Sequence, residues 1–153
     1  MKNLLCSALV AGTILLSGAK SIWSDEVVTY EKNIKPIVEK YCIACHGNNA
    51  PPYGEFKKEK NKWIQLGLGP KMDTYEDLMT FVNGDDAGAL MRRLDDGTNK
   101  PDGKPGNMYI FLGKTEDERK ENLKIFKKWV GHWSLKRKKE WTEEDYKAIK
   151  AIK

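Results

Sequence analysis

The sequence predicts an all-α domain followed by a C-terminal helical extension. Apolar residues recur at the spacing of a helix in separate stretches, above all in residues 30–41 and 123–133. Residue types that cap helix N-termini precede further helical patterns, as at Thr115 and Thr142. No βαβ pattern surrounds the C-x-x-C spacing of residues 42–45, which argues against a mixed sheet at that point.

The first 24 residues have the pattern of a secretory signal peptide. Lys2 gives a short positive start, and an apolar run follows over residues 4–16. This run is shorter than the roughly 20 residues that span a bilayer, which favours cleavage over a permanent anchor. Small residues allow a cut after Ala19 or after Ser24. We therefore expect a bacterial protein that is exported to the periplasm, without stable membrane insertion after cleavage.

The mature chain of about 130 residues suits one domain, which we place at residues 25–134, with a basic helical extension at 135–153. Loss of Lys2 and Lys20 with the signal lowers the formal net charge from +5 to +3. This mildly basic balance is not that of a nucleic-acid-binding protein. No nucleic-acid partner is therefore expected.

A helix is predicted at the start of the mature chain, because five apolar residues gather on one side of it. It should begin near Asn33, since Pro36 is tolerated only close to a helix start or at a kink. The helix leads directly into the motif at residues 42–46. Its apolar residues are Tyr30, Ile34, Ile37, Val38 and Tyr41.

Cys42, Cys45 and His46 have the C-x-x-C-H spacing by which a chain attaches a c-type haem. Two thiols three residues apart fall on one face of a helical turn, where each can bond one vinyl group of the porphyrin. His46 follows directly and can bind the iron as the proximal ligand. The cysteine count agrees, because Cys6 lies in the signal and only the motif pair remains.

Other uses of this spacing are less well supported. A zinc site needs two more ligands, and the only other residues of these types are Cys6 and His132. A thioredoxin-like dithiol follows a strand of a βαβ unit, which is missing here. A simple disulfide leaves His46 unexplained.

Residues 47–62 are rich in Gly, Asn, Pro and charge, and they predict a loop. The apolar residues 63–68 after it could fold over a haem edge. Asp73 or Thr74 should cap a helix at 75–83. A further short helix is expected at 87–94.

A Pro- and Gly-rich stretch, residues 97–108, is predicted to lack regular structure and ends at Met108. A thioether on such a loop is placed where a sixth iron ligand is expected, and Met108 is our first choice. Met91 is the main alternative, although its position beside leucines on a helix favours packing. His132, Met72, Met79 and an open sixth position remain as further alternatives.

The spacing Thr115 to Glu118 predicts a capping box and a helix that begins near Glu116. Its apolar face should pack across the helix that precedes the motif. Lysines on its other side either form a solvated face or offer a docking surface to an acidic redox partner. A last short helix should start at Thr142, with Tyr146, Ile149 and Ile152 as a narrow apolar stripe.

Residues 41–47 (YCIACHG), the helix before them, the loop that ends at Met108 and the closing helix together resemble a class I cytochrome c. The resemblance covers most of the mature chain. It implies an all-α, cytochrome c-like domain wrapped around one covalently attached haem c, with His46 and Met108 as axial ligands. The long insert at 97–107 and the tail after Trp133 depart from the smallest members of the family.

This resemblance implies an electron-transfer protein and not an enzyme. We expect a periplasmic monomer that carries one electron between redox proteins. Two alternatives stay open. One is a fixed cytochrome subunit of a larger oxidoreductase, and the other is a haem enzyme or gas sensor with a displaceable sixth ligand.

Overall fold

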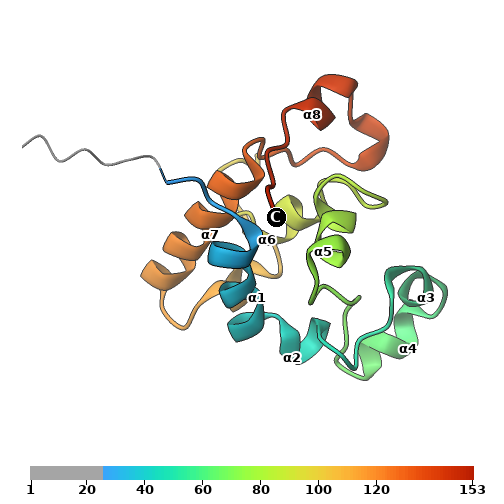
Figure 1. Ribbon diagram of the computed structural model, residues 1–153. Helices are drawn as coiled ribbons and strands as arrows, with labels where there is room; N and C mark the ends of the chain where they lie inside the picture. Colours follow the sequence, from blue (N-terminus) through green and yellow to red (C-terminus); the bar gives the residue numbers. More distant parts are fainter. Residues whose placement is uncertain (1–25) are drawn as a thin grey trace, which may run out of the picture.

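The computed structural model describes residues 26–153, and these residues form helices and connecting segments without any strand (Figure 1). The predicted all-α fold class is therefore confirmed. The predicted signal peptide lies outside the described residues. The elements are η1 (Tyr30–Ile34), α1 (Lys35–Tyr41), α2 (Ile43–His46), α3 (Tyr53–Lys58), α4 (Lys60–Gln65), α5 (Tyr75–Val82), α6 (Ala89–Leu94), η2 (Tyr109–Leu112), α7 (Glu116–Val130), η3 (Lys138–Glu140) and α8 (Glu143–Lys147).

The first helix predicted from the sequence is present as η1 and α1. Thr29 caps it, because the Thr29 side chain accepts a hydrogen bond from the Lys32 N–H at 3.3 Å. The five residues of η1 have π-helical hydrogen bonding, and α1 begins directly after them at Lys35. Pro36 therefore lies in the first turn of α1, directly after the π-helical turn η1, so the irregular hydrogen bonding occurs where the proline lacks an N–H.

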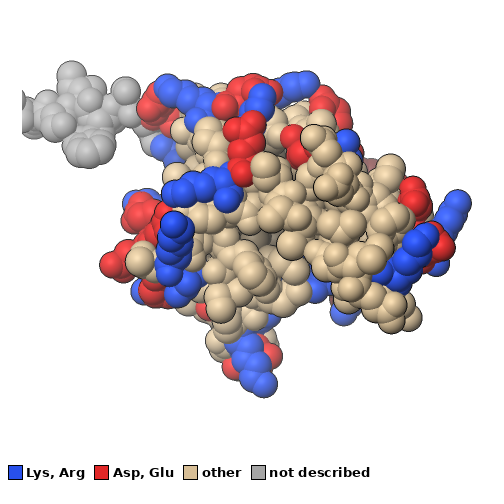
Figure 2. All heavy atoms as spheres, turned by 90° about the horizontal axis from the view of Figure 1, so that it is seen from below, with Lys and Arg blue, Asp and Glu red and all other residues tan. Residues whose placement is uncertain are grey.

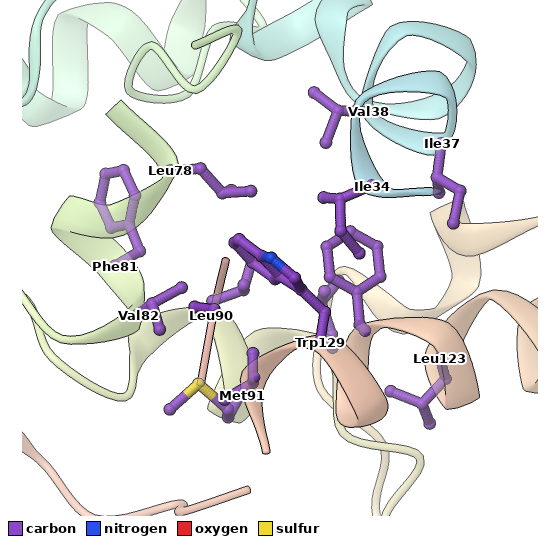
Figure 3. Packing of buried hydrophobic residues seen from close by; sticks show 14 of the residues in the cluster. Ile34, Ile37, Val38, Leu78, Phe81, Val82, Leu90, Met91, Leu123 and Trp129 are labelled. Carbon is purple, nitrogen blue, oxygen red and sulfur yellow. The ribbon is translucent and has the colours of Figure 1, made fainter. Parts of the chain in front are cut away.

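The core is centred on Trp129 of α7, whose side chain is 1% exposed. Figure 3 shows its indole between Ile34 of η1 and Leu78 of α5. The indole N–H is also satisfied, because it donates to the Ile152 carbonyl at 2.8 Å. Contact between α7 and η1 confirms the predicted packing of the closing helix across the first one.

Glu118 of α7 joins the closing helix to the end of α1. Its carboxylate accepts hydrogen bonds from the Tyr41 hydroxyl, from the Lys40 ammonium at 3.1 Å and from the Lys114 N–H at 2.7 Å. Thr115 caps α7 as predicted, since its hydroxyl accepts from the Glu118 N–H at 3.2 Å. The Glu118 carboxylate reaches Lys114 instead of closing the predicted box on Thr115. It therefore ties α7 to α1.

Glu118→Gln should make stability less sensitive to acid. The Tyr41 hydroxyl, the Lys114 N–H and Lys40 lower the pKa of Glu118 from about 4.5 to about 2 in the folded protein. A lowered pKa means that the ionised form stabilises the fold above about pH 4.5, and that this contribution is lost as the pH falls toward 2. Urea unfolding between pH 6 and pH 2 should show a shallower decline for the variant.

Glu143→Gln is the matched control, because the Glu143 carboxylate pairs with Lys147 on α8 and both side chains are exposed. It should decline with pH as the parent does. Equal pH profiles for Glu118→Gln and the parent would contradict the role of this carboxylate.

The predicted loop at 47–62 is wrong over most of its second half, because α3 and α4 lie there. Pro52 is the N-cap residue of α3, a position that a proline can take without losing an intrahelical bond. Tyr53 packs its ring edge-on against Phe81 of α5 at 5.1 Å between ring centroids. This contact fixes the α3–α4 pair, which lies on the side of the molecule away from α7 (Figure 1).

The predicted apolar stripe of the last helix is also wrong. Thr142 caps α8 as expected, but α8 ends at Lys147, so Ile149 and Ile152 lie beyond it. The segment after α8 is extended, because its backbone bonds to other elements instead of to itself. The Ile152 carbonyl accepts from the Tyr30 N–H at 2.8 Å, and the Lys150 N–H donates to Val130 at 2.9 Å.

Candidate haem-binding site

Cys42 joins α1 to α2, and Cys45 and His46 lie on α2, so the three residues share one helical turn. The N–H groups of Cys45 and His46 donate to the Cys42 carbonyl at 3.2 and 3.0 Å. Both thiols are free of disulfide bonds, and both line the same cavity as the His46 ring. The turn thus has the one-sided arrangement that the spacing predicted. Burial, and secondly the neighbouring Cys45, raise the pKa of the Cys42 thiol to about 11.

The His46 ring is buried and held in one orientation. Its Nδ1 atom lies 2.7 Å from the Pro70 carbonyl, which acts as acceptor when Nδ1 carries the proton. In that tautomer Nε2 keeps its lone pair for a metal. Burial lowers the pKa of His46, against the opposing effect of the Pro70 carbonyl, so the neutral imidazole that a metal requires is favoured.

Gly69 allows the chain to pass directly over the His46 ring. Its N–H donates to the Cys45 carbonyl at 2.9 Å, so this segment runs alongside the motif turn. A Cβ atom at residue 69 would lie 2.1 Å from His46 Cε1 and 2.6 Å from Nδ1. Only glycine fits this close approach without displacing the ring.

The cavity beside the motif has a volume of about 610 Å³ and is mostly apolar. Its walls come from all the helices from α1 to α7 and from η2, so the unpredicted helices α3 and α4 form part of it. Large apolar side chains at 43% to 62% exposure, Ile43, Ile64, Leu66, Ile110 and Phe111, come from three of these elements or their ends. Figure 2 shows a face with uncharged side chains in its middle and charged ones around its edge.

Met108 and Met72 line this cavity, whereas Met91 does not. Met91 is 0% exposed and packs in the core, which is the packing role that its helical position indicated. Met79 also packs against the core, and His132 binds the Asp145 carboxylate at 2.9 Å. The Met72 N–H donates to the His46 carbonyl at 2.9 Å, so the backbone of Met72 lies next to that of His46.

Met108 is held by backbone bonds to the end of α6. Its N–H donates to the Arg93 carbonyl at 3.0 Å, and the Gly106 N–H donates to the Asp95 carbonyl at 2.7 Å. The long loop before it therefore leaves α6 and returns to the same place. Residues 97–108 contain no helix, as predicted.

Asp95 organises this loop through its buried side chain, a role that no sequence pattern indicated. The carboxylate is 0% exposed. It accepts from the Gly97 N–H at 2.9 Å, the Asn99 amide at 2.9 Å and the Trp133 indole N–H at 3.0 Å. All three donors are neutral, and together they satisfy a charge that would otherwise be costly to bury.

A family profile described as PccH cytochrome c matches residues 29–152 of this chain. The chain belongs to the PccH cytochrome c family. A solved structure, the monohaem cytochrome PccH from Geobacter sulfurreducens, is 51% identical in sequence. The match covers 84% of this chain and 100% of that one, with a TM-score of 0.79. No protein in a search of curated sequences matched.

Membership of the PccH family makes the protein a monohaem c-type cytochrome, with one covalently bound haem c and a role in electron transport. The residues present fit this cofactor. Two free thiols, an imidazole with Nε2 available and an apolar cavity of suitable size occur together. Within residues 26–153, no group of three His, Cys, Asp or Glu side chains offers another metal site.

Residues 26–153 of this PccH-family protein contain no helix with both the length and the apolar character needed to cross a membrane.

Proposed function

We propose that this protein is a periplasmic one-electron carrier in which His46 and Met108 are the axial iron ligands. The observation that carries the proposal is the shared cavity, which collects the motif thiols, the His46 imidazole and the Met108 thioether. When bound, the haem supplies a reversible change between Fe(III) and Fe(II). The periplasmic location rests on the signal-like pattern of residues 1–24.

The chain's own residues account for a carrier more readily than for a reactive centre. Cys42 and Cys45 fix the cofactor covalently, while the Pro70 carbonyl keeps the His46 ring in one orientation. The apolar walls keep water away, which limits solvent reorganisation on electron transfer. A thioether at the second axial position favours the reduced state, because sulfur is a soft ligand.

Met108 is preferred to Met72 because of where each backbone is attached. The backbone N–H of Met72 donates to the His46 carbonyl, so Met72 lies on the same side of the site as His46. Met108 is carried by a different part of the chain, bonded to the end of α6. A sixth ligand must approach from the face opposite the proximal histidine, which Met108 is better placed to do.

Met108→Leu should abolish six-coordination while the fold is kept. Leucine has a similar volume to methionine, so the packing part of the stability loss should stay below about 1.5 kcal/mol, in addition to the loss of the iron–sulfur bond. The ferrous variant should bind carbon monoxide readily, whereas the parent should not. Absorption spectra with and without carbon monoxide measure this, together with a redox titration in which the variant's potential differs from that of the parent.

Met72→Leu and Met91→Leu are the matched controls, and both should retain the parent spectrum. If Met72→Leu loses the six-coordinate spectrum and Met108→Leu keeps it, Met72 is the sixth ligand. Ready carbon monoxide binding by the unaltered protein would favour a gas-binding or enzymatic role over a carrier.

The lysines of α7 give limited support to the predicted docking surface for an acidic partner. Lys120, Lys124 and Lys127 lie 3.7 to 3.9 Å from carboxylates of this same chain, so part of their charge is compensated internally.

A further inference from the structure

A second cavity, of about 470 Å³, borders the haem cavity on the side of α6. Its polar lining contains one carboxylate, that of Asp86. The same lining contains five cationic side chains, Lys60, Arg92, Arg93, Lys100 and Arg137. We call this set the cationic pocket.

Asp86 cannot neutralise the pocket, because one carboxylate faces five cations. It is already paired with Arg92 at 3.1 Å. The Arg93 guanidinium instead donates to the neutral Asn107 side chain at 2.8 Å. Over residues 26–153, no ion pair is found for the side chains of Lys60, Lys100 or Arg137.

Arg92 is fixed at the centre of this group. Its Nη1 atom donates to the carbonyls of Ala87, at 3.2 Å, and Lys136, which locks the planar fork in place. Loss of hydration lowers the pKa of Arg92, and the positive charges of Arg137 and Arg93 lower it further. Asp86 has the opposite, weaker effect. Like charges are thus held together in a preformed cavity, which is the arrangement expected where an anion completes the charge balance.

Two haem propionates would carry at most two negative charges, whereas the five cations exceed the one carboxylate of the lining by four charges. Lys60 and Arg93 line both cavities, so they are the cations available to groups on the haem side. Arg92, Lys100 and Arg137 line the cationic pocket alone. Asp86 is the only carboxylate in the lining that these three cations share. They are therefore available to an anion that enters the pocket from solution.

We propose that the cationic pocket is a binding site for oxyanion groups, carboxylate or phosphate, next to the haem cavity. Guanidinium forks and lysine ammonium groups are the side chains that proteins use for these anions. The oxyanion comes either from a small solute or from acidic side chains of a redox partner. In the second case the pocket would bring the partner close to the haem, an outcome that rests on the proposed carrier function.

Titration calorimetry of the haem-loaded protein with inorganic pyrophosphate tests the site itself. We expect saturable binding at low salt, with one anion per protein. The double variant Lys100→Gln/Arg137→Gln should bind at least about tenfold more weakly, because two charge-assisted contacts are removed. The control Lys120→Gln/Lys124→Gln removes the same charge from α7, outside the pocket, and should bind as the parent does.

Absence of saturable binding, or equal weakening in both double variants, would overturn the proposal, because only net charge would then be involved. Hexaglutamate, titrated at the same ionic strength, distinguishes the two sources. Tighter pocket-dependent binding of the peptide than of pyrophosphate assigns the site to a partner's acidic side chains. Tighter binding of pyrophosphate assigns it to a small solute. Both results are independent of which residue is the sixth iron ligand.

Discussion

Gly69→Ala should displace the His46 ring and leave much of the protein without correctly coordinated haem. The added Cβ atom would meet His46 Cε1 at 2.1 Å and Nδ1 at 2.6 Å. The ring would have to move by about 1 Å to restore even a 3.0 Å contact. Overpacking of this kind typically costs about 1–3 kcal/mol, and we expect a value at the upper end here.

Neither side of this contact can move freely. The backbone at residue 69 is bonded to the Cys45 carbonyl at 2.9 Å, and two residues later Lys71 is bonded to Pro51 at 2.8 Å. If the ring rotates instead, it loses the Pro70 carbonyl that selects the tautomer. Both adjustments alter the atom that is proposed to bind the iron.

The ratio of covalently bound haem to protein and the low-spin absorption spectrum measure the effect, and urea unfolding gives the stability loss. Gly54→Ala is the matched control, since a Cβ atom there meets nothing within 4 Å and residue 54 lies in α3. It should be neutral or slightly stabilising. Equal haem content and stability in the two variants would show that the ring tolerates the contact.

Local features were the ones that the sequence could predict. The C-x-x-C-H turn depends on contacts within five residues, and it folds as its spacing indicates. The same holds for the caps at Thr74, Thr115 and Thr142, where a hydroxyl accepts from an N–H three residues later. Met108, at the end of the loop, lines the same cavity as His46, while its role as the sixth iron ligand stays a prediction.

Features that depend on distant partners were missed. The apolar spacing of Tyr53 and Phe56 is helical, but it lies in a charged stretch after two prolines, and its packing partner Phe81 is far along the chain. The extended path after α8 likewise depends on acceptors and donors in η1 and α7. Asp95 is the clearest case, because its Trp133 donor is 38 residues away.

Asp95→Asn should destabilise the protein by about 3 kcal/mol, although the substitution hardly changes the side chain's volume. One carboxylate oxygen accepts from the Gly97 N–H and the other from Asn99 and Trp133. An asparagine amide has one accepting oxygen, so its NH₂ group must face at least one of these donors whichever way it is turned. A buried donor then loses its acceptor.

The loss should be felt first in the loop that carries Met108, because Gly97 and Asn99 belong to that loop and Trp133 does not. Urea unfolding followed by absorption of the haem and by tryptophan fluorescence separates the two effects. In the variant, the spectral change that reports loss of the sixth ligand should precede the fluorescence change. Coincident transitions would mean that Asp95 supports the whole fold and not the loop in particular.

Asp102→Asn is the control within the same loop. The Asp102 carboxylate is exposed and accepts from the Lys104 N–H at 3.1 Å, so its loss should cost little. A large loss of stability in Asp95→Asn with a small one in Asp102→Asn would show that the buried Asp95 carboxylate determines the path of the loop. The position of Met108 would then depend on a carboxylate that itself is absent from the haem cavity lining.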